Sequence, residues 1–260
     1  MRYDGYLLCS DMDLTLKNTD GTISKENQEA IRLFQKNGGR FTVVTGRNAA
    51  HIAEYGDAFV PNAPICALNG AHIYDLATKQ ELYRGTLPLD ESVLPTVVDA
   101  IREKAEELIF FRVINDTTLA DFSSPEEIEQ NADLICNGQW CKVLTTWRSE
   151  EAALHVMHRF MDSSLTERFL FSRSWKTGLE FNARCDCKGA AALRLKEMLP
   201  DVRKLVCIGD YENDLSMIES ADLGVAVANA APAVLQIADM ITVSNDEAAL
   251  AALIASLPEL

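Results

Sequence analysis

Asp11-Met12-Asp13-Leu14-Thr15 is the stretch that decides the fold, together with the apolar run Tyr6-Leu7-Leu8-Cys9 just before it. The apolar run predicts a buried strand near the start of the chain. Ligands of open α/β sheets bind outside the carboxyl ends of the strands, and the two aspartates stand at such an end. Aspartates also cap turns, so this stretch by itself leaves a turn and a functional site equally open.

The segment that follows predicts a second strand beside the first. Ser24 has the character of a helix N-cap, and Gly38-Gly39 ends the helical spacing after it. Phe41-Thr42-Val43-Val44 is another buried-strand run, and it leads into Thr45-Gly46-Arg47. A strand-helix-strand unit makes its strands parallel neighbours, so Thr45 is expected at the same sheet edge as Asp11. A helix over about residues 49–59, a short strand over residues 64–68 and a turn at Asn69-Gly70 complete this part.

The middle of the chain follows a different pattern. Between about residues 86 and 182, helical and strand-like runs alternate in the order α-β-β-α-β-α-β-β, which describes an α+β domain with its sheet covered on one face. From Lys188 the first pattern returns, with a helix over residues 188–198 and a buried strand over residues 205–208. We therefore expect a Rossmann-like α/β core with a parallel sheet, residues 1–85 and 183–260, and an inserted α+β cap domain, residues 86–182.

The composition describes a globular chain. Apolar residues make up 48% of the sequence and charged residues 24%, as in soluble domains. A formal net charge of -15 argues against nucleic acid or an acidic membrane surface as a partner. The cysteines have irregular spacing and are expected as buried free thiols. No run has the character of a signal peptide or a membrane span, so the cytoplasm is the expected location.

Polar residues gather at the expected ends of the core strands and at one helix start. Lys188 taken alone is an ordinary helix-start lysine, but a cation opposes the dipole at a helix N-terminus, which indicates a local reason for it. Asp210 and Asp214 by themselves fit a capping arrangement. Their joint placement at one sheet edge favours a site instead. The full set is Asp11 with Asp13, Thr45, Lys188, and Asp210 with Asn213 and Asp214.

This ordered set resembles the haloacid dehalogenase superfamily of phosphohydrolases. With the inserted domain between Thr45 and Lys188, it most resembles the Cof-type sugar-phosphate phosphatases. Leu14 stands where the family commonly has glycine, and the tail Asn245-Asp246-Glu247-Ala248 lacks the glycine often seen there, at a place that touches no catalytic role. The resemblance covers roughly residues 1–85 and 183–255 and extends to Val43-Val44-Thr45-Gly46-Arg47, Asn69-Gly70-Ala71, Val225-Ala226-Val227-Ala228-Asn229-Ala230 and Ala238-Asp239.

The resemblance implies a role for each residue of the set. Asp11 is the expected nucleophile, which forms an aspartyl-phosphate, and Asp13 is the expected general acid and then general base. Thr45 and Lys188 are expected to bind the phosphoryl group, helped by backbone N–H groups around Met12 and Gly46. Arg47 is compatible both with phosphate binding and with pairing to a carboxylate of the cleft. The expected substrate contacts are Thr45, Gly46, Arg47, Asn69, Lys188 and Asn213.

Charge counting supports a metal ion in this site. The four carboxylates would repel one another and a phosphate dianion in a half-buried cleft, and Lys188 alone cannot balance them. A divalent cation and a proton on Asp13 bring the summed charge of the protein groups in the cleft close to zero. The resemblance implies Mg²⁺ as the cofactor, held by Asp11, Asp210 and Asp214 and by the backbone carbonyl of Asp13.

Three functional hypotheses follow. The first, favoured by the resemblance, is a Mg²⁺-dependent phosphatase for a small phosphorylated metabolite such as a sugar phosphate. The second is a phosphosugar mutase, which would use Asp11 in the same way but return the phosphoryl group to its substrate. The third is a phospho-acceptor regulator, which would need neither Asp13 as an acid nor a cap. In the cap, Arg173 and Lys176 are candidate contacts of the leaving group or else solvated surface groups.

Overall fold

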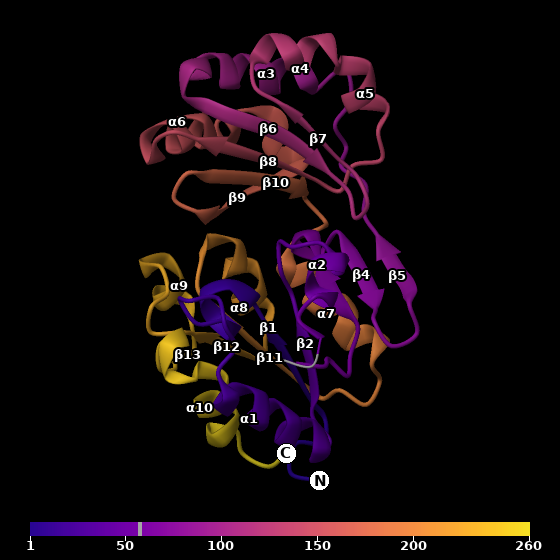
Figure 1. The fold of residues 1–260 in the computed structure, drawn as a ribbon, viewed down its shortest axis with the longest axis vertical. Helices are drawn as coiled ribbons and strands as arrows, with labels where there is room; N and C mark the ends of the chain where they lie inside the picture. Colours follow the sequence, from indigo (N-terminus) through magenta and orange to yellow (C-terminus); the bar gives the residue numbers. More distant parts are fainter. Residues whose placement is uncertain (57–58) are drawn as a thin grey trace. The chain divides into compact units, whose positions relative to one another are not determined.

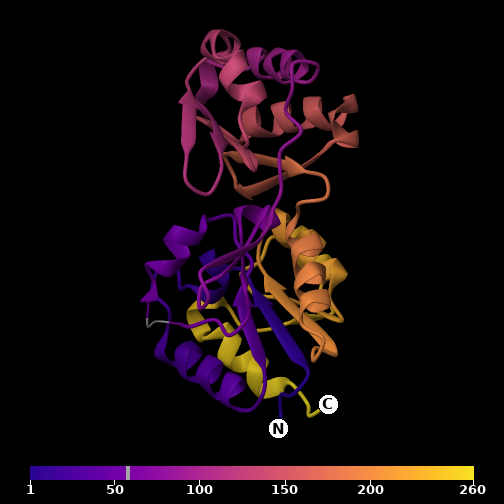
Figure 2. The ribbon, with the colours of Figure 1, turned by 90° about the vertical axis from the view of Figure 1, so that its right-hand side faces the viewer.

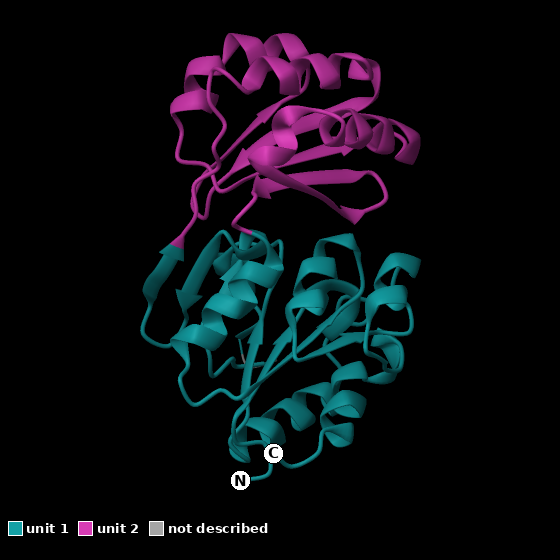
Figure 3. Ribbon diagram, turned by 180° about the vertical axis from the view of Figure 1, so that it is seen from behind, with its two compact units in different colours: residues 1–83, 187–260 teal, residues 84–186 magenta. Residues whose placement is uncertain are grey.

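The computed structural model describes residues 1–56 and 59–260, which divide into two compact units (Figures 1 and 3). Unit 1 combines residues 1–83 with residues 187–260, and unit 2 is residues 84–186. The chain therefore passes from one unit to the other between Tyr83 and Arg84 and between Asp186 and Cys187, whereas the sequence pattern placed the boundaries after residues 85 and 182. Unit 1 is discontinuous in sequence, and unit 2 is inserted into it.

Unit 1 is built on a parallel sheet with the strand order β13-β12-β11-β1-β2. Neighbouring strands pair in parallel throughout, as expected for an α/β core. The prediction that the first two strands are parallel neighbours is confirmed, because Ser10 pairs with Val43. The strands are β1 (Tyr6–Ser10), β2 (Arg40–Val43), β11 (Lys204–Gly209), β12 (Leu223–Ala226) and β13 (Met240–Ile241).

Helices cover the two faces of this sheet, and β1 has no exposed residue. Leu7 and Cys9 pack in one apolar cluster with Ala191 and Leu195 of α7. Tyr6 points to the other face, where its ring lies 6.5 Å from that of Phe34 in α1. The continuous apolar run of β1 is explained by this burial on both faces. The helices of unit 1 are α1 (Lys25–Lys36), α2 (Ala49–Ala53), α7 (Lys188–Met198), α8 (Leu215–Ser220), α9 (Pro232–Ile237) and α10 (Ala249–Ser256).

Two local predictions in unit 1 differ from the structure. The helix α2 ends at Ala53, whereas the sequence predicted a helix to about residue 59, and residues 57 and 58 of that range lie outside the described residues. The sequence analysis also missed a hairpin that pairs with β3 (Ile65–Ala67) and consists of β4 (His72–Asp75) and β5 (Gln80–Arg84). Its turn contains neither glycine nor proline. Instead, the Asp75 side chain accepts two backbone N–H groups, and Lys79 takes the positive φ of 58°.

Unit 2 contains an antiparallel sheet with the order β7-β6-β8-β10-β9. Side chains from alternate positions of these strands join residues of α3 and α6 in one apolar core, so helices cover one face of the sheet (Figure 1). The strands are β6 (Leu108–Ile114), β7 (Leu119–Phe122), β8 (Lys142–Trp147), β9 (Phe169–Trp175) and β10 (Gly178–Ala183), and the helices are α3 (Leu94–Arg102), α4 (Pro125–Gln130), α5 (Ala132–Asn137) and α6 (Glu150–Met161).

Two short helices, α4 and α5, follow Ser124 in unit 2. Ser124 accepts a hydrogen bond from the backbone N of Glu127, as an N-cap does. Asn131 then leaves the helical conformation, with φ -108° and ψ 21°, and its side-chain amide donates to the carbonyl of Glu127 at 2.8 Å. This local side-chain bond competes with helix continuation and ends α4 before α5 begins.

Both ends of the chain lie close together in unit 1 (Figures 1 and 2). The Tyr3 hydroxyl donates to the carbonyl of Ile254 at 3.1 Å, and the Tyr6 hydroxyl donates to the carbonyl of Pro258 at 3.1 Å. Within the part of the chain that the structure describes, no helix has both the length and the apolar composition needed to cross a membrane.

Leu14, where the family resemblance leads us to expect glycine, and Ala248, in the tail that lacks one, are left-handed in this chain. Leu14 has φ 59° and ψ 11°, and Ala248 has φ 59° and ψ 55°. A residue with a Cβ pays about 1–2 kcal/mol in this region, which glycine does not. Leu14 and Ala248 therefore hold an unfavourable backbone conformation that contacts with other residues must stabilise.

Ala248→Gly is expected to raise the free energy of unfolding by roughly 0.5–1 kcal/mol, because the relief of strain exceeds the entropic cost of a glycine. Urea denaturation of both proteins measures the difference. Ala252→Gly, in the interior of α10, is the matched control and should lower the free energy by about 1 kcal/mol. A loss of the same size in both variants would contradict the strain argument.

Candidate active site

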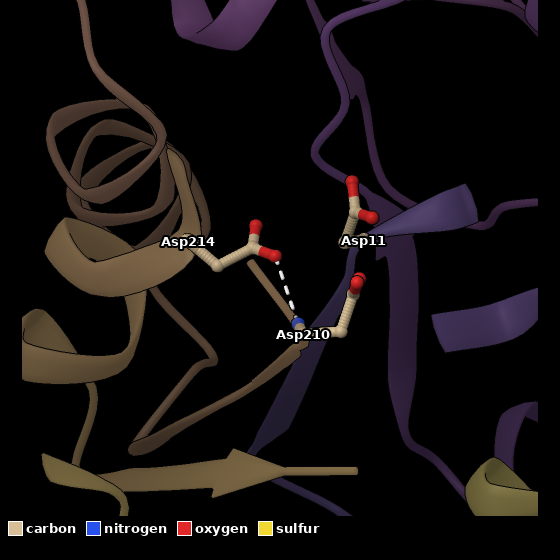
Figure 4. Close-up of side chains that lie close together, drawn as sticks. All are labelled: Asp11, Asp210 and Asp214. Atoms are coloured by element: carbon tan, nitrogen blue, oxygen red, sulfur yellow. Dashed lines mark hydrogen bonds between the residues drawn. The ribbon is translucent and has the colours of Figure 1, made fainter. Parts of the chain in front are cut away.

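Asp11 stands where β1 ends, beside the end of β11. Its backbone N donates to the carbonyl of Ile208 at 2.9 Å, which continues the pairing of the two strands by one residue. Its side chain makes no capping bond to the turn that follows, so the reading of Asp11 as a turn cap is wrong. Figure 4 shows its carboxylate close to those of Asp210 and Asp214.

Asp210 and Asp214 come from the end of β11 and the turn after it. Asp210 accepts a hydrogen bond from the Thr15 hydroxyl at 2.8 Å. Asp214 uses one oxygen to accept from the backbone N of Asp210 at 2.9 Å and of Tyr211 at 3.2 Å. Asp214 thus caps this turn as the simpler interpretation held, and its other oxygen is directed into the site.

Lys188 joins the two sides of the site. It is the first residue of α7, and its side chain is fully buried. Its Nζ lies 2.6 Å from Oδ1 of Asp11 and 2.6 Å from Oδ1 of Asp214. The local reason for a cation at this helix N-terminus is therefore the pair of carboxylates that it contacts.

Close packing of two helices holds Lys188 in place. A Cβ at Gly189 would overlap the backbone carbonyl oxygen of Ser216, so only glycine allows α7 to approach α8 this closely. The backbone N of Gly189 also donates to the Ser216 hydroxyl at 3.2 Å. The position of the lysine follows from the contact between these helices.

Burial dominates the electrostatics of the acidic residues. It raises the pKa of Asp11 to about 7 and that of Asp210 to about 8, although the Lys188 ammonium opposes both shifts. Burial alone would lower the pKa of Lys188, but Asp11 and Asp214 more than offset this effect and raise it. One lysine, which contacts two of them, is thus the counter-charge for three buried carboxyl groups, and this leaves the site short of positive charge.

The acidic residues fit a divalent cation. Among residues 1–56 and 59–260, Asp11, Asp210 and Asp214 form the one group of potential ligands, each with an oxygen within 4.8 Å of the others. Hard cations prefer such carboxylate oxygens. The side chain of Asp13 is outside this group, and the assignment of its backbone carbonyl to the metal stays a prediction.

Asp13 has a different environment, which the sequence analysis did not predict. Arg47 binds its carboxylate through Nε at 2.6 Å and Nη2 at 2.8 Å, and Lys17 Nζ lies 2.9 Å from Oδ1. Burial would raise the pKa of Asp13, but these hydrogen bonds outweigh it and lower the pKa. The expected proton on Asp13 is therefore disfavoured in this conformation. Of the two interpretations of Arg47, the structure shows pairing with a carboxylate.

Sequence reasoning missed Thr15 and Lys17. Lys17 stands four residues after Asp13, a spacing that brings side chains together in a helical turn and was a usable signal. The turn is wide, and it closes through a hydrogen bond from the backbone N of Lys17 to the carbonyl of Met12 at 2.8 Å. Arg47 also contacts the ring of His51, which lies one turn further along.

The other predicted substrate contacts form a chain of hydrogen bonds. Thr45 is buried, its hydroxyl accepts from the backbone N of Arg47 at 3.3 Å, and its carbonyl accepts from Asn69 N at 2.9 Å. The Asn213 amide donates to Asn69 Oδ1 at 3.4 Å. Gly46 lies between Thr45 and Arg47 in the same loop.

Two candidates lie in unit 2. Arg173 is buried, and its Nη1 donates to Glu150 Oε1 at 3.0 Å, so its description as a solvated surface group is wrong. Lys176 is exposed. A contact of either residue with a substrate stays a prediction.

A family model and a sequence relative both match most of this chain. The family model for haloacid dehalogenase-like hydrolases matches residues 8–254. The sequence is 28% identical over 242 residues to the 5-amino-6-(5-phospho-D-ribitylamino)uracil phosphatase YcsE of Bacillus subtilis, which covers 93% of this chain and 91% of that protein.

Solved structures share the fold. A haloacid dehalogenase-like hydrolase from B. subtilis has a TM-score of 0.78 at 22% identity, over 96% of this chain and 99% of that one. The subclass IIB sugar phosphatase BT4131 has a TM-score of 0.75 at 17% identity, over 96% of this chain and 97% of that one.

Binding of a divalent cation is expected to weaken as the pH falls from about 8.5 to about 6, because the cation needs deprotonated carboxylates. The folded-state pKa values of Asp11 and Asp210 lie above the ordinary value of 3.8. The stability that their protons contribute without metal is thus present at low pH and lost as the pH rises through about 7 to about 8.

Calorimetric titration with Mg²⁺, Mn²⁺ and Ca²⁺ in buffers of different ionisation heat measures the affinity and the protons released. Asp201→Asn, which changes an exposed carboxylate paired with Arg40, is the control and should leave both unchanged. Affinity that does not vary with pH would contradict the burial argument.

Proposed function

Because the chain belongs to the haloacid dehalogenase-like hydrolase family, we propose that it hydrolyses a small sugar phosphate with Mg²⁺ through an aspartyl-phosphate on Asp11. The chain is a phosphatase, the activity for which YcsE is named. The observation that carries the mechanism is the buried Lys188 ammonium, 2.6 Å from both Asp11 and Asp214, at the edge of an acidic cluster.

Asp11 has the position of an in-line nucleophile. Its carboxylate lies at the carboxyl end of β1, and one of its oxygens is bound by Lys188. Its other oxygen attacks phosphorus, the bond from phosphorus to the leaving oxygen breaks, and the aspartyl-phosphate forms. Lys188 and the loop of Thr45 and Gly46 supply hydrogen-bond donors for the phosphoryl oxygens.

Asp210, Asp214 and Asp11 would hold the cation. When bound, Mg²⁺ supplies the positive charge that the cluster lacks and neutralises charge on the phosphoryl group. Thr15 orients Asp210, and the backbone of the following turn orients Asp214. Both carboxylates are thus fixed before any ligand arrives, which lowers the cost of assembling the site.

Asp13 serves the two proton transfers. It donates a proton to the leaving alkoxide in the first step, and it accepts one from the water that attacks the aspartyl-phosphate in the second. Arg47 and Lys17 stabilise its ionised form, which suits the second step. For the first step Asp13 must gain a proton, so its bonds to Arg47 and Lys17 must weaken when substrate binds.

The substrate class is argued from relatives and from charge. YcsE is named for a phosphorylated ribityl compound and BT4131 for sugar phosphates, and both classes join a phosphate to a chain of hydroxyl groups. In a chain of net charge -15, Lys188, Lys17 and Arg47 offset most of the charge of the four aspartates, and a bound divalent cation would add the excess positive charge that attracts an anion. We assign unit 2 to recognition of the leaving group.

Asp11→Asn is expected to abolish phosphate release, because the amide keeps the shape of the side chain but cannot attack phosphorus. Phosphate release from a panel of phosphorylated sugars, sugar alcohols and nucleotides measures this, with and without EDTA. Chelation should stop the reaction and added Mg²⁺ should restore it, while Asp201→Asn stays active. An active Asp11→Asn protein would sink the covalent mechanism. Isomerisation of a hexose 1-phosphate in the presence of its bisphosphate would instead favour the mutase.

Asp13→Asn is expected to lower kcat by roughly 10²–10⁴-fold, the usual contribution of a general acid–base group. Substrates with a good leaving group need no acid in the first step, so with them the variant should accumulate the phosphorylated enzyme. Acid quenching and mass measurement of the intact chain detect this adduct. Equal losses with good and poor leaving groups, and no adduct, would contradict the role of Asp13.

A further inference from the structure

The segment after the catalytic aspartates is held by side chains from the far end of the chain. The carbonyl of Leu14 accepts a hydrogen bond from Asn229 Nδ2 at 2.9 Å, and the carbonyl of Lys17 accepts one from Asn245 Nδ2 at 3.0 Å. Asn229 Oδ1 in turn accepts from the backbone N of Asn245 at 2.9 Å. The two asparagines are therefore linked, and together they hold both ends of Leu14–Lys17.

Two further contacts continue this arrangement. Asn27 in α1 donates its amide to the carbonyl of Leu16 at 3.4 Å, and its Oδ1 accepts from the backbone N of Ala251 at 3.0 Å. Asp246 accepts from the backbone N and the hydroxyl of Thr19, at 2.7 and 2.8 Å. The loop after β13 thus binds Lys17 and Thr19 directly, and α10 is linked to the carbonyl of Leu16 through Asn27.

The segment carries side chains that contact both halves of the site. Thr15 donates to Asp210 at 2.8 Å, and Lys17 binds Asp13 at 2.9 Å. Thr15 lies between the two carbonyls that the asparagines bind, those of Leu14 and Lys17. A shift of this backbone would therefore move the hydroxyl away from Asp210 and the ammonium away from Asp13.

The hydrogen bond from Asn229 also explains how Leu14 keeps a left-handed conformation. Its φ of 59° is unfavourable for a residue with a Cβ, and its side chain is exposed, so core packing does not hold it. The Asn229 amide binds the carbonyl of this same residue. Loss of that bond would let Leu14 relax and would release the segment.

We propose that Asn229 and Asn245 are positioning residues of the phosphatase reaction, which set Thr15 and Lys17 by holding the carbonyls of Leu14 and Lys17. The inference rests on the proposed function. It gives the tail after β13 a part in the reaction, whereas the sequence analysis gave that tail no catalytic role.

Asn229→Ala is the first test, because Asn229 is exposed and its truncation leaves no cavity. We expect kcat to fall about tenfold or more with KM within about twofold, as for an interaction that supports the transition state only. Hydrogen exchange of a peptide over residues 12–19 should accelerate. Asn245→Ala should have the same effects, although Asn245 is buried.

Asn62→Ala is the matched control. Asn62 is also an exposed asparagine of unit 1 whose side chain bridges two backbone groups, the carbonyl of Gly39 at 3.0 Å and the N of Phe41 at 2.7 Å. It should leave kcat and the exchange of residues 12–19 unchanged. A loss of kcat in Asn229→Ala no larger than in Asn62→Ala overturns the proposal, and so does faster exchange with unchanged kcat.

Leu14→Gly provides the rescue experiment. Glycine adopts the left-handed conformation without strain, so Asn229→Ala should cost less kcat when Leu14 is already glycine. The double variant is compared with Leu14→Gly alone, and at least about a third of the kcat that Asn229→Ala costs in the unmodified protein should be recovered. Additive losses overturn the proposed link between the two residues. The proposed function is checked separately, since it fails if the unmodified protein releases no more phosphate than Asp11→Asn.

Discussion

The site depends on one buried ammonium that two carboxylates share. Lys188 Nζ lies 2.6 Å from both Asp11 and Asp214, which are themselves buried. Removing one member of such a group leaves a charge without compensation in a low-dielectric setting, which is strongly destabilising. The lysine is placed by the contact of α7 with α8 at Gly189, and Asp11 by the pairing of β1 with β11. The packing of the core of unit 1 therefore also sets the geometry of the site. A substitution that disturbs the packing of these helices and strands changes the site as well.

The carboxyl groups of the site divide into two kinds by environment. Burial raises the pKa of Asp11 and Asp210, so they need positive charge from outside to remain ionised. Arg47 and Lys17 lower the pKa of Asp13, which already has positive charge in excess. A metal cation that stabilises the ionised forms of Asp11 and Asp210 is therefore not needed to keep Asp13 ionised. The residue assigned to proton transfer is thus the one whose ionised form is stabilised by protein side chains, and its proton affinity depends on its hydrogen bonds to Arg47 and Lys17.

Much of the core could be predicted because it follows from local patterns. Three local features indicated a site at the edge of the sheet: the apolar run of β1, the strand-helix-strand unit, and the position of Lys188 against the helix dipole. The β4–β5 hairpin could not be predicted, since its turn lacks the residues that mark turns, with Lys79 in place of a glycine. Pairing of Arg47 with a carboxylate was one of the two interpretations, but Asp13 could not be identified as that carboxylate, because Arg47 lies in a different loop and side-chain pairing between loops leaves no periodic signal. Asn229 and Asn245 act on backbone carbonyls, which every residue has, so their role has no signature in residue type.

The discontinuity of unit 1 has a consequence for its biosynthesis. A ribosome completes residues 84–186 before β11, the neighbour of β1, has been made. Unit 2 has its own apolar core and antiparallel sheet, so it can fold while β1 and β2 still lack their partner. Asp11 is made before unit 2, but Lys188 and Asp210 come more than a hundred and seventy residues after it. A nascent chain therefore carries Asp11 through the synthesis of unit 2 without Lys188 and the other acidic residues of the cluster, and the cluster assembles only when β11 pairs with β1.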